Sequence, residues 1–279
     1  MKAGSLPGYV FADDVERGAT HHAALLAVLS EMLDPFTTWR LSRYVTPTSR
    51  CLEVAAGSGS VAEWLAQRAD EVTATDTDPT HVAAVAAKYP NLTVRRHDLV
   101  TDPLEEGRWD VIHVRLLLAH LPSRHELVGK LAAALAPGGV LVIDEFQPSW
   151  DWCVLDAPDR LLARRLFAAY HEALLTVLAA AGNDTTFGRN AHRTMRDHGL
   201  VDIDVELWAK SWSGGQPGCQ LPYLAAAQLA PKLIEAGLSA DDLATFRQLL
   251  QDPRLLIHSN LVVSTAGRRP FTVAAAREG

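Results

Sequence analysis

The sequence predicts an α/β fold, a doubly wound and mostly parallel sheet of seven strands with helical insertions that form a cap. Three observations predict it. Strand-like and helix-like runs alternate from Arg50 to Asp144, a glycine-rich turn follows the first strand-like run, and two β-like runs at 201–207 and 255–265 resemble a closing antiparallel pair. Parallel neighbours require crossover helices, since a tight hairpin cannot join them.

Composition and charge narrow the class of protein. The 279 residues include 48% hydrophobic and 21% charged residues, as in ordinary globular proteins. The formal charge of −7 argues against a sequence-independent grip on nucleic acid. No run reaches the roughly 18 apolar residues of a membrane span. The three cysteines lie far apart without a C-x-x-C pair, so we expect no metal, no disulfide framework and a cytoplasmic location.

The chain opens with a helical segment and continues into the alternating core. Residues 1–45 are expected to form an N-terminal helical cap segment, in which residues 23–33 place leucines at helical spacing. Residues 46–149 form the core. Its strands are CLEVA, EVTATD, LTVRR, DVIHV and GVLVID, and its helices are SVAEWLAQRA, THVAAVAAKY and ELVGKLAAALA. Asp78-Pro79 and the capping box Ser123-x-x-Glu126 mark two helix starts, and Pro137-Gly138-Gly139 is expected to end the last helix.

The second half departs from the alternation. Residues 150–199 are expected to be a helical cap containing one long helix from 159 to 181. Residues 200–267 read as a strand pair with helices inserted at 217–251, because polar and apolar residues alternate from 201 to 207. The tail, 268–279, is expected to fray.

The segment Glu53-Val-Ala-Ala-Gly57-Ser-Gly59 carries the chemistry. Glycines let the backbone approach a ligand closely. The overlapping run Gly57-Ser-Gly59-Ser-Val-Ala62 satisfies G-x-G-x-x-A, and Asp76 follows at a distance suited to a ribose. A nicotinamide-dependent oxidoreductase is therefore one alternative. Two acids favour another cofactor: Glu53 would repel a pyrophosphate and attract an ammonium, and Asp98 can accept a hydrogen bond from an adenine amino group.

These motifs together resemble the class I S-adenosylmethionine-dependent methyltransferases, with a Rossmann-like fold. The resemblance spans Glu53–Gly59, Thr75-Asp76, His97-Asp98-Leu99, Asp110–Arg115 and Leu135–Asp144. Ala55 stands where that family often has its first glycine. The resemblance implies S-adenosyl-L-methionine as cofactor, S-adenosyl-L-homocysteine as product, and these cofactor-binding residues: Tyr9, Glu53, Ala55, Gly57, Gly59, Asp76, Thr77, Asp98, Leu99 and, through its main chain, Arg115.

Candidate catalytic residues follow from the sheet. In open α/β sheets the ligand lies beyond the carboxyl ends of the strands, where His120, Asp144 and Glu145 are expected. Each is a candidate general base, should the acceptor have to lose a proton. Purely structural roles are alternatives for two of these residues. His120 could stabilise the loop that follows the fourth strand, and Glu145 could cap a helix. His113 lies inside a strand and is interpreted as a satisfied core histidine.

Aromatic residues after the core suggest the acceptor site. Trp150, Trp152 and Tyr170 are the predicted substrate-binding residues, since rings offer large contact area. The sequence thus predicts a methyltransferase for a small organic acceptor, plausibly in bacterial specialised metabolism, with homodimer formation left open. A second alternative is a protein of this fold that binds the cofactor without transferring a methyl group.

Overall fold

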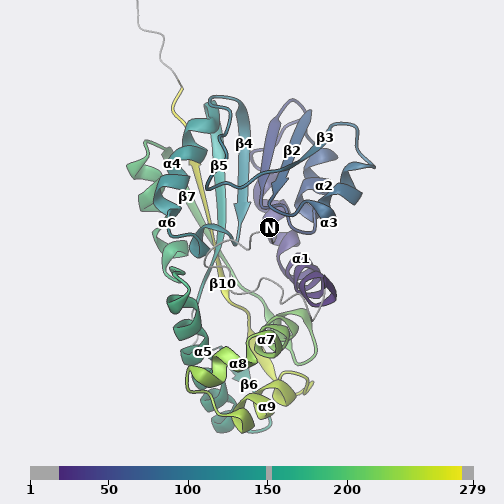
Figure 1. Cartoon of the computed structure of the whole chain (residues 1–279), viewed down its shortest axis with the longest axis vertical. Helices are drawn as coiled ribbons and strands as arrows, with labels where there is room; N and C mark the ends of the chain where they lie inside the picture. Colours follow the sequence, from purple (N-terminus) through teal and green to yellow (C-terminus); the bar gives the residue numbers. More distant parts are fainter. Residues whose placement is uncertain (1–18, 149–152, 272–279) are drawn as a thin grey trace, which may run out of the picture.

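A seven-stranded sheet organises the molecule (Figure 1). The structure is a computed structural model that describes residues 19–148 and 153–271. The strand order is β3-β2-β1-β4-β5-β10-β7. β1 to β5 pair in parallel, while β10 runs antiparallel to both of its neighbours. The mostly parallel sheet is confirmed. The strands are β1 (Arg50–Val54), β2 (Glu71–Asp76), β3 (Leu92–Arg96), β4 (Trp109–Arg115), β5 (Leu135–Gln147), β7 (Val201–Trp208) and β10 (Leu261–Arg268).

Helices cover both faces of this sheet, which makes it doubly wound. Apolar side chains of α2 (Ser60–Ala66) and the end of α1 (Ala19–Leu41) pack with β1, β2 and one face of β5, and α3 (Thr80–Ala86) adds Val82. Those of α4 (Arg124–Ala134) and α6 (Phe187–Asp197) pack on the other face. The short 3-10 helix η1 (Leu118–His120) follows β4. Alternate strand residues point to opposite faces, so each core strand contributes to both layers.

The predicted helical cap forms the other end of the molecule (Figure 1). It contains α5 (Arg160–Ala180), α7 (Pro217–Gln228), α8 (Ala230–Glu235) and α9 (Ala240–Leu249). A small sheet joins them, in the order β6-β9-β8, from β6 (Val154–Asp156), β8 (Ser211–Ser213) and β9 (Leu256–His258). The long helix and the inserted helices lie where we expected them, but α6, which falls within the 150–199 segment expected to form the cap, packs on the large sheet instead. Among the described residues, no helix combines the length and apolar character needed to cross a membrane.

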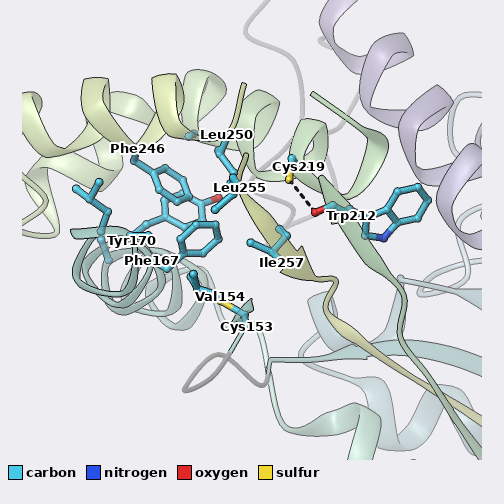
Figure 2. Packing of buried hydrophobic residues seen from close by; sticks show 14 of the residues in the cluster. Cys153, Val154, Phe167, Tyr170, Trp212, Cys219, Phe246, Leu250, Leu255 and Ile257 are labelled. Atoms are coloured by element: carbon cyan, nitrogen blue, oxygen red, sulfur yellow. Dashed lines mark hydrogen bonds between the residues drawn. The ribbon is translucent and has the colours of Figure 1, made fainter. Parts of the chain in front are cut away.

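A hydrophobic cluster holds the cap together (Figure 2). The ring of Tyr170 stacks on Phe246, with centroids 4.4 Å apart, and Phe167 meets Phe246 edge-on. The Cys219 thiol lies 3.8 Å from the carbonyl oxygen of Trp212. This cluster is continuous with residues of α1, so helices far apart in the chain share one core.

Three local predictions were wrong. The β-like run 255–265 is two strands in different sheets, because the chain leaves the small sheet after His258 and enters the large one at Leu261. Gly138 and Gly139 do not separate helix from strand, because β5 already begins at Leu135 and contains both glycines. The pairing register between β4 and β5 shifts at this point. Ser123 makes no side-chain cap bond, because its backbone lies outside the extended region that a capping residue adopts.

Candidate functional site

A pocket lies at the carboxyl ends of β1 and β2. Its lining contains five predicted cofactor-binding residues, Ala55, Asp76, Thr77, Asp98 and Leu99, together with Val54, His97, Leu117 and Leu121. The parallel order β3-β2-β1-β4 brings these strand ends to one edge. Two carboxylates and no lysine or arginine belong to this lining.

The glycine-rich loop is built from left-handed backbone. Ala55, Gly57 and Gly59 have φ of 54°, 51° and 83°. The Gly57 N–H donates to Asp76 Oδ2 over 2.9 Å, and the Asp78 N–H donates to Asp76 Oδ1 over 3.0 Å. Asp76 therefore ties the loop to the end of β2. A Cβ on Gly59 would lie 3.0 Å from Val82 Cγ2, so only glycine fits there without displacing α3.

Helix α1 covers the same loop. The Ser30 hydroxyl lies 2.9 Å from the Ser58 hydroxyl and 3.2 Å from that of Ser60. Leu26 packs so closely that a Cβ on Gly57 would lie 3.2 Å from its Cδ2. The predicted N-terminal helix is thus part of the site, which its leucine spacing alone does not indicate.

The third acidic motif forms a turn at the end of β3. Asp98 Oδ1 accepts from the Val100 N–H, and the Asp98 N–H donates to Asp102 Oδ2, each over 2.9 Å. The bond from the Asp98 N–H and, after it, the bond from the Thr101 hydroxyl hold the pKa of Asp102 below its usual range. The turn fixes the carboxylate of Asp98 at the pocket wall beside Leu99.

Glu53 and Asp144 are joined through a histidine. Glu53 Oε2 lies 2.7 Å from His113 Nδ1, and Asp144 Oδ2 lies 3.4 Å from His113 Nε2. The Thr37 hydroxyl of α1 donates to Asp144 Oδ2 over 2.8 Å. His113 is buried and bonded on both ring nitrogens, so its interpretation as a satisfied core histidine is confirmed.

The two candidate acids of β5 point to opposite faces of the sheet, since they are neighbours in a strand. Glu145 accepts the Ala119 N–H over 3.1 Å, at the start of the loop that forms η1. Burial raises the pKa of Glu145 to about 7, although backbone N–H groups of Leu117 to Ala119 oppose the rise. This geometry favours the capping alternative for Glu145, because its carboxyl group accepts the backbone N–H of Ala119 in η1.

His120 sits on η1 between the sheet and the end of α5. Its Nδ1 pairs with Asn183 Oδ1, while Asn183 Nδ2 donates to the Leu178 carbonyl, which orients the amide. Since Oδ1 only accepts, the ring proton lies on Nδ1 and the lone pair on Nε2. Burial lowers the pKa of His120, so the imidazole is neutral at pH 7.

Sequence comparison supplies the family. Residues 28–213 match the family model described as a methyltransferase domain. The chain belongs to the class I S-adenosylmethionine-dependent methyltransferases. This methyltransferase is 32% identical over 155 residues to methyltransferase str2 of Strobilurus tenacellus, covering 52% of the chain and 50% of that protein. It is 31% identical over 106 residues to trans-aconitate 2-methyltransferase of Variovorax paradoxus, covering 37% of the chain and 41% of that enzyme.

Structural comparison agrees on the fold. Haemonchus contortus phosphoethanolamine N-methyltransferase 2, solved in complex with S-adenosyl-L-methionine, aligns with a TM-score of 0.57 at 16% identity, over 96% of this methyltransferase and 61% of that protein. The chain spans half or less of the length of the curated relatives named above.

The pocket of this methyltransferase fits its family's cofactor. The lining carries two carboxylates for hydroxyl and amino groups, Asp76 and Asp98, and the loop glycines leave the backbone open to close approach. A lining without lysine or arginine suits a phosphate-free cation better than a dinucleotide. This argues against the nicotinamide alternative.

Several predicted residues lie elsewhere. Tyr9, Trp150 and Trp152 fall outside the described residues. The side chain of Arg115 points to α1, donating to Asp34 Oδ1 over 2.9 Å and to Thr37 Oγ1 over 3.2 Å. Tyr170 is 1% exposed inside the cap cluster, so it packs in the hydrophobic core and does not line an open pocket.

Sequence reasoning missed several contributors. Thr37 joins the buried acids to α1, and four further residues line the pocket: Val54, His97, Leu117 and Leu121. The only signal for His97 is its place directly before Asp98. Nothing in the pattern of α1 singles out Thr37.

Proposed function

We propose that this methyltransferase transfers the methyl group of S-adenosyl-L-methionine to a small organic acceptor. The observation that carries the proposal is the pocket in which Asp76 binds the Gly57 N–H and faces the same space as Asp98 and Leu99. Asp76 would bind the ribose hydroxyls, Asp98 and Leu99 the adenine, and the glycine-rich loop the methionine part. Tyr9 and Arg115 would complete the cofactor site.

The cofactor, when bound, supplies an electrophilic methyl group on a sulfonium. The chain's own part is then to exclude water and to hold the acceptor atom about 3–3.5 Å from that methyl group, which is where most of the rate enhancement of such a displacement originates. Helix α1 contributes by closing over the glycine-rich loop.

His120 is the residue that we propose as general base. Burial lowers the pKa of His120, so its imidazole is neutral at pH 7, and Asn183 holds the ring in place. Glu145 serves it indirectly: by accepting the Ala119 N–H, its carboxyl group supports the loop that carries His120. Asp144 is 0% exposed and bonded to Thr37, which favours a positioning role over contact with the acceptor.

The surroundings favour a small and partly apolar acceptor. Partly buried apolar residues, among them Leu116, Phe146 and Tyr223, pack against the cap cluster beside the end of the sheet. The name of the Variovorax relative refers to a small carboxylic acid. A role in bacterial specialised metabolism, with Trp150 and Trp152 at the acceptor, extends this proposal. The three free, buried cysteines support a reducing, cytoplasmic location.

Binding and turnover test the proposal separately. Calorimetric titration of the purified chain with S-adenosylhomocysteine should show saturable binding, and titration with NADH should show none. Incubation with S-adenosylmethionine and a panel of hydroxy acids, phenols and trans-aconitate should release S-adenosylhomocysteine with at least one acceptor class. Binding of NADH without S-adenosylhomocysteine would overturn the assignment, whereas tight binding without turnover across the panel would favour a cofactor-binding protein.

A further inference from the structure

Three ionisable groups are enclosed together on one face of the sheet. Glu53 of β1, His113 of β4 and Asp144 of β5 have side chains that are 4%, 0% and 0% exposed. The imidazole stands between the two carboxylates, 2.7 Å from Glu53 and 3.4 Å from Asp144. Burying isolated charges is costly unless they are paired and hydrogen-bonded, so each of the three groups depends on the other two for a partner.

The histidine is the positive member of that unit. Burial disfavours the imidazolium, but the charge of Glu53 and the bonds to both acids outweigh burial and raise the pKa of His113 to about 9. Burial also pushes the pKa of Asp144 upward, yet His113, Ser264 and Thr37 together keep it below its usual range. At neutral pH the unit therefore holds a protonated His113 between the side chains of Glu53 and Asp144.

The unit is anchored to α1. The Thr37 hydroxyl donates to Asp144, and Arg115 donates to both Thr37 and Asp34. One turn further, the buried Arg40 donates to Ser264 Oγ over 3.2 Å and to Asp204 Oδ2 over 2.6 Å.

The other charged groups on this face are paired or neutral. Asp34 pairs with Arg115, and Arg40 with Asp204; the exposed Arg43 pairs with Glu206. Burial raises the pKa of the Cys51 thiol to about 12, so it stays uncharged. His113 is consequently the group in this set that changes charge between pH 7 and 10.

The first half of α1 contacts the glycine-rich loop. The same helix that binds Asp144 through Thr37 carries Ser30, which meets Ser58 and Ser60, and Leu26, which packs on Gly57. Glu53 itself lies two residues before the left-handed Ala55 of that loop. Both ends of the buried unit thus lead to the glycine-rich loop, one through β1 and one through α1.

We propose that His113 is a positioning residue for cofactor binding: its contacts with Glu53 and Asp144 hold β1, β4 and β5 together and thereby keep α1 seated on the glycine-rich loop. The proposal rests on the proposed function, in which that loop binds S-adenosylmethionine. His113 does not belong to the pocket lining and acts through its two acids. When the imidazolium loses its proton, the unit loses its positive charge and one of its two N–H donors, and the contact that seats α1 is weakened.

The test measures cofactor affinity rather than turnover. Dissociation constants for S-adenosylhomocysteine are determined by calorimetry at pH 7.5, 8.5 and 9.5 for the wild type, for His113→Gln, and for His198→Gln as a matched control at an exposed histidine of the other face. We expect the dissociation constant of the wild type to rise about fourfold between pH 7.5 and 9.5, because a pKa of about 9 leaves roughly a quarter of His113 protonated at pH 9.5. His113→Gln should bind at least tenfold more weakly at pH 7.5 and show no further loss at pH 9.5.

Affinity of His113→Gln within twofold of the wild type, or an unchanged alkaline loss in that variant, would overturn the proposal. Should His113→Gln fail to fold, Thr37→Val, which keeps the side-chain shape but cuts the link from Asp144 to α1, must weaken binding at pH 7.5 by several-fold; unchanged affinity overturns the proposal equally. Absence of binding by the wild type would instead refute the proposed function. Nitrogen-15 spectra of the wild-type histidines then decide the charge of His113, since a neutral ring at pH 7.5 would contradict it.

Discussion

Replacement of Asp76 by alanine tests the cofactor site most directly. In the structure the carboxylate accepts the Gly57 N–H through Oδ2 and the Asp78 N–H through Oδ1, and it lines the pocket. The alanine variant loses a charged acceptor for the ribose hydroxyls and also releases the glycine-rich loop from β2. Both effects reduce affinity for the cofactor and its product.

The magnitude follows from the bonds lost. A hydrogen bond to a charged group contributes about 1.5–3 kcal/mol, which corresponds to roughly a 10- to 150-fold rise in the dissociation constant. Asp76→Asn keeps one oxygen that can accept the Gly57 N–H, so it should lose about tenfold, near the lower limit of that range. Both variants lose the charge, so the difference between their affinities measures the contribution of the remaining oxygen that anchors the Gly57 N–H.

Calorimetric titration with S-adenosylhomocysteine at pH 7.5 measures the effect. Asp70→Ala is the matched control, because Asp70 is an exposed acid directly before β2 and outside the pocket lining. Its dissociation constant should equal that of the wild type. An Asp76→Ala variant that binds within twofold of the wild type, while retaining its circular dichroism spectrum, would refute the placement of the ribose at the end of β2.

Three further variants test the packing around the site by thermal and urea unfolding. Arg40→Ala should lower the free energy of unfolding by about 2–4 kcal/mol, because it removes a buried guanidinium whose partner Asp204 is partly hydrated; a loss under 1 kcal/mol contradicts this. Glu145→Gln should be stabilising relative to wild type at pH 8.5, by up to about 3 kcal/mol, and should lose this advantage as pH falls below 5. The sign follows from the pKa of Glu145, which is raised to about 7 in the folded state, so the wild type loses stability as pH rises through 7. A difference in unfolding free energy that did not change with pH would contradict this prediction. Gly59→Ala should cost more than the roughly 1–2 kcal/mol of left-handed strain expected for Gly199→Ala, because a Cβ meets Val82 at residue 59 and open space at residue 199; equal losses would show that α3 yields.

The sequence predicted the elements well where the signal was local. The alternation from β1 to β5 and the length of α5 follow from hydrophobic spacing, and Asp76 and Asp98 were placed at strand ends by their position in the chain. The split between β9 and β10 was missed, since an apolar run is equally compatible with one strand or two. The side-chain bond predicted for Ser123 was also missed, because capping depends on backbone angles that a residue type only favours.

The candidate catalytic residues show a different limit. Asp144 and Glu145 were both placed at the carboxyl end of a strand, and both lie near it, but their alternation puts them on opposite faces of the sheet. The partners on each face then determine their roles: Thr37 and His113 for Asp144, and the backbone of Ala119 for Glu145. Tyr170 was selected for its helix face, and the cluster around Phe246 buried it.

The sequence by itself determined the edge of the sheet at which the family binds its cofactor. That edge has a glycine-rich turn after the first strand and acidic residues at the ends of the second and third strands. These features depend on backbone conformation and strand order over short stretches, which residue types strongly bias. Only the tertiary structure decided that Glu53, His113, Asp144 and Thr37 touch, across 60 residues from Glu53 to His113 and 107 from Thr37 to Asp144. Such contacts arise because crossover connections place β1, β4 and β5 side by side and α1 packs across them, and the burial that results sets the charge of each group.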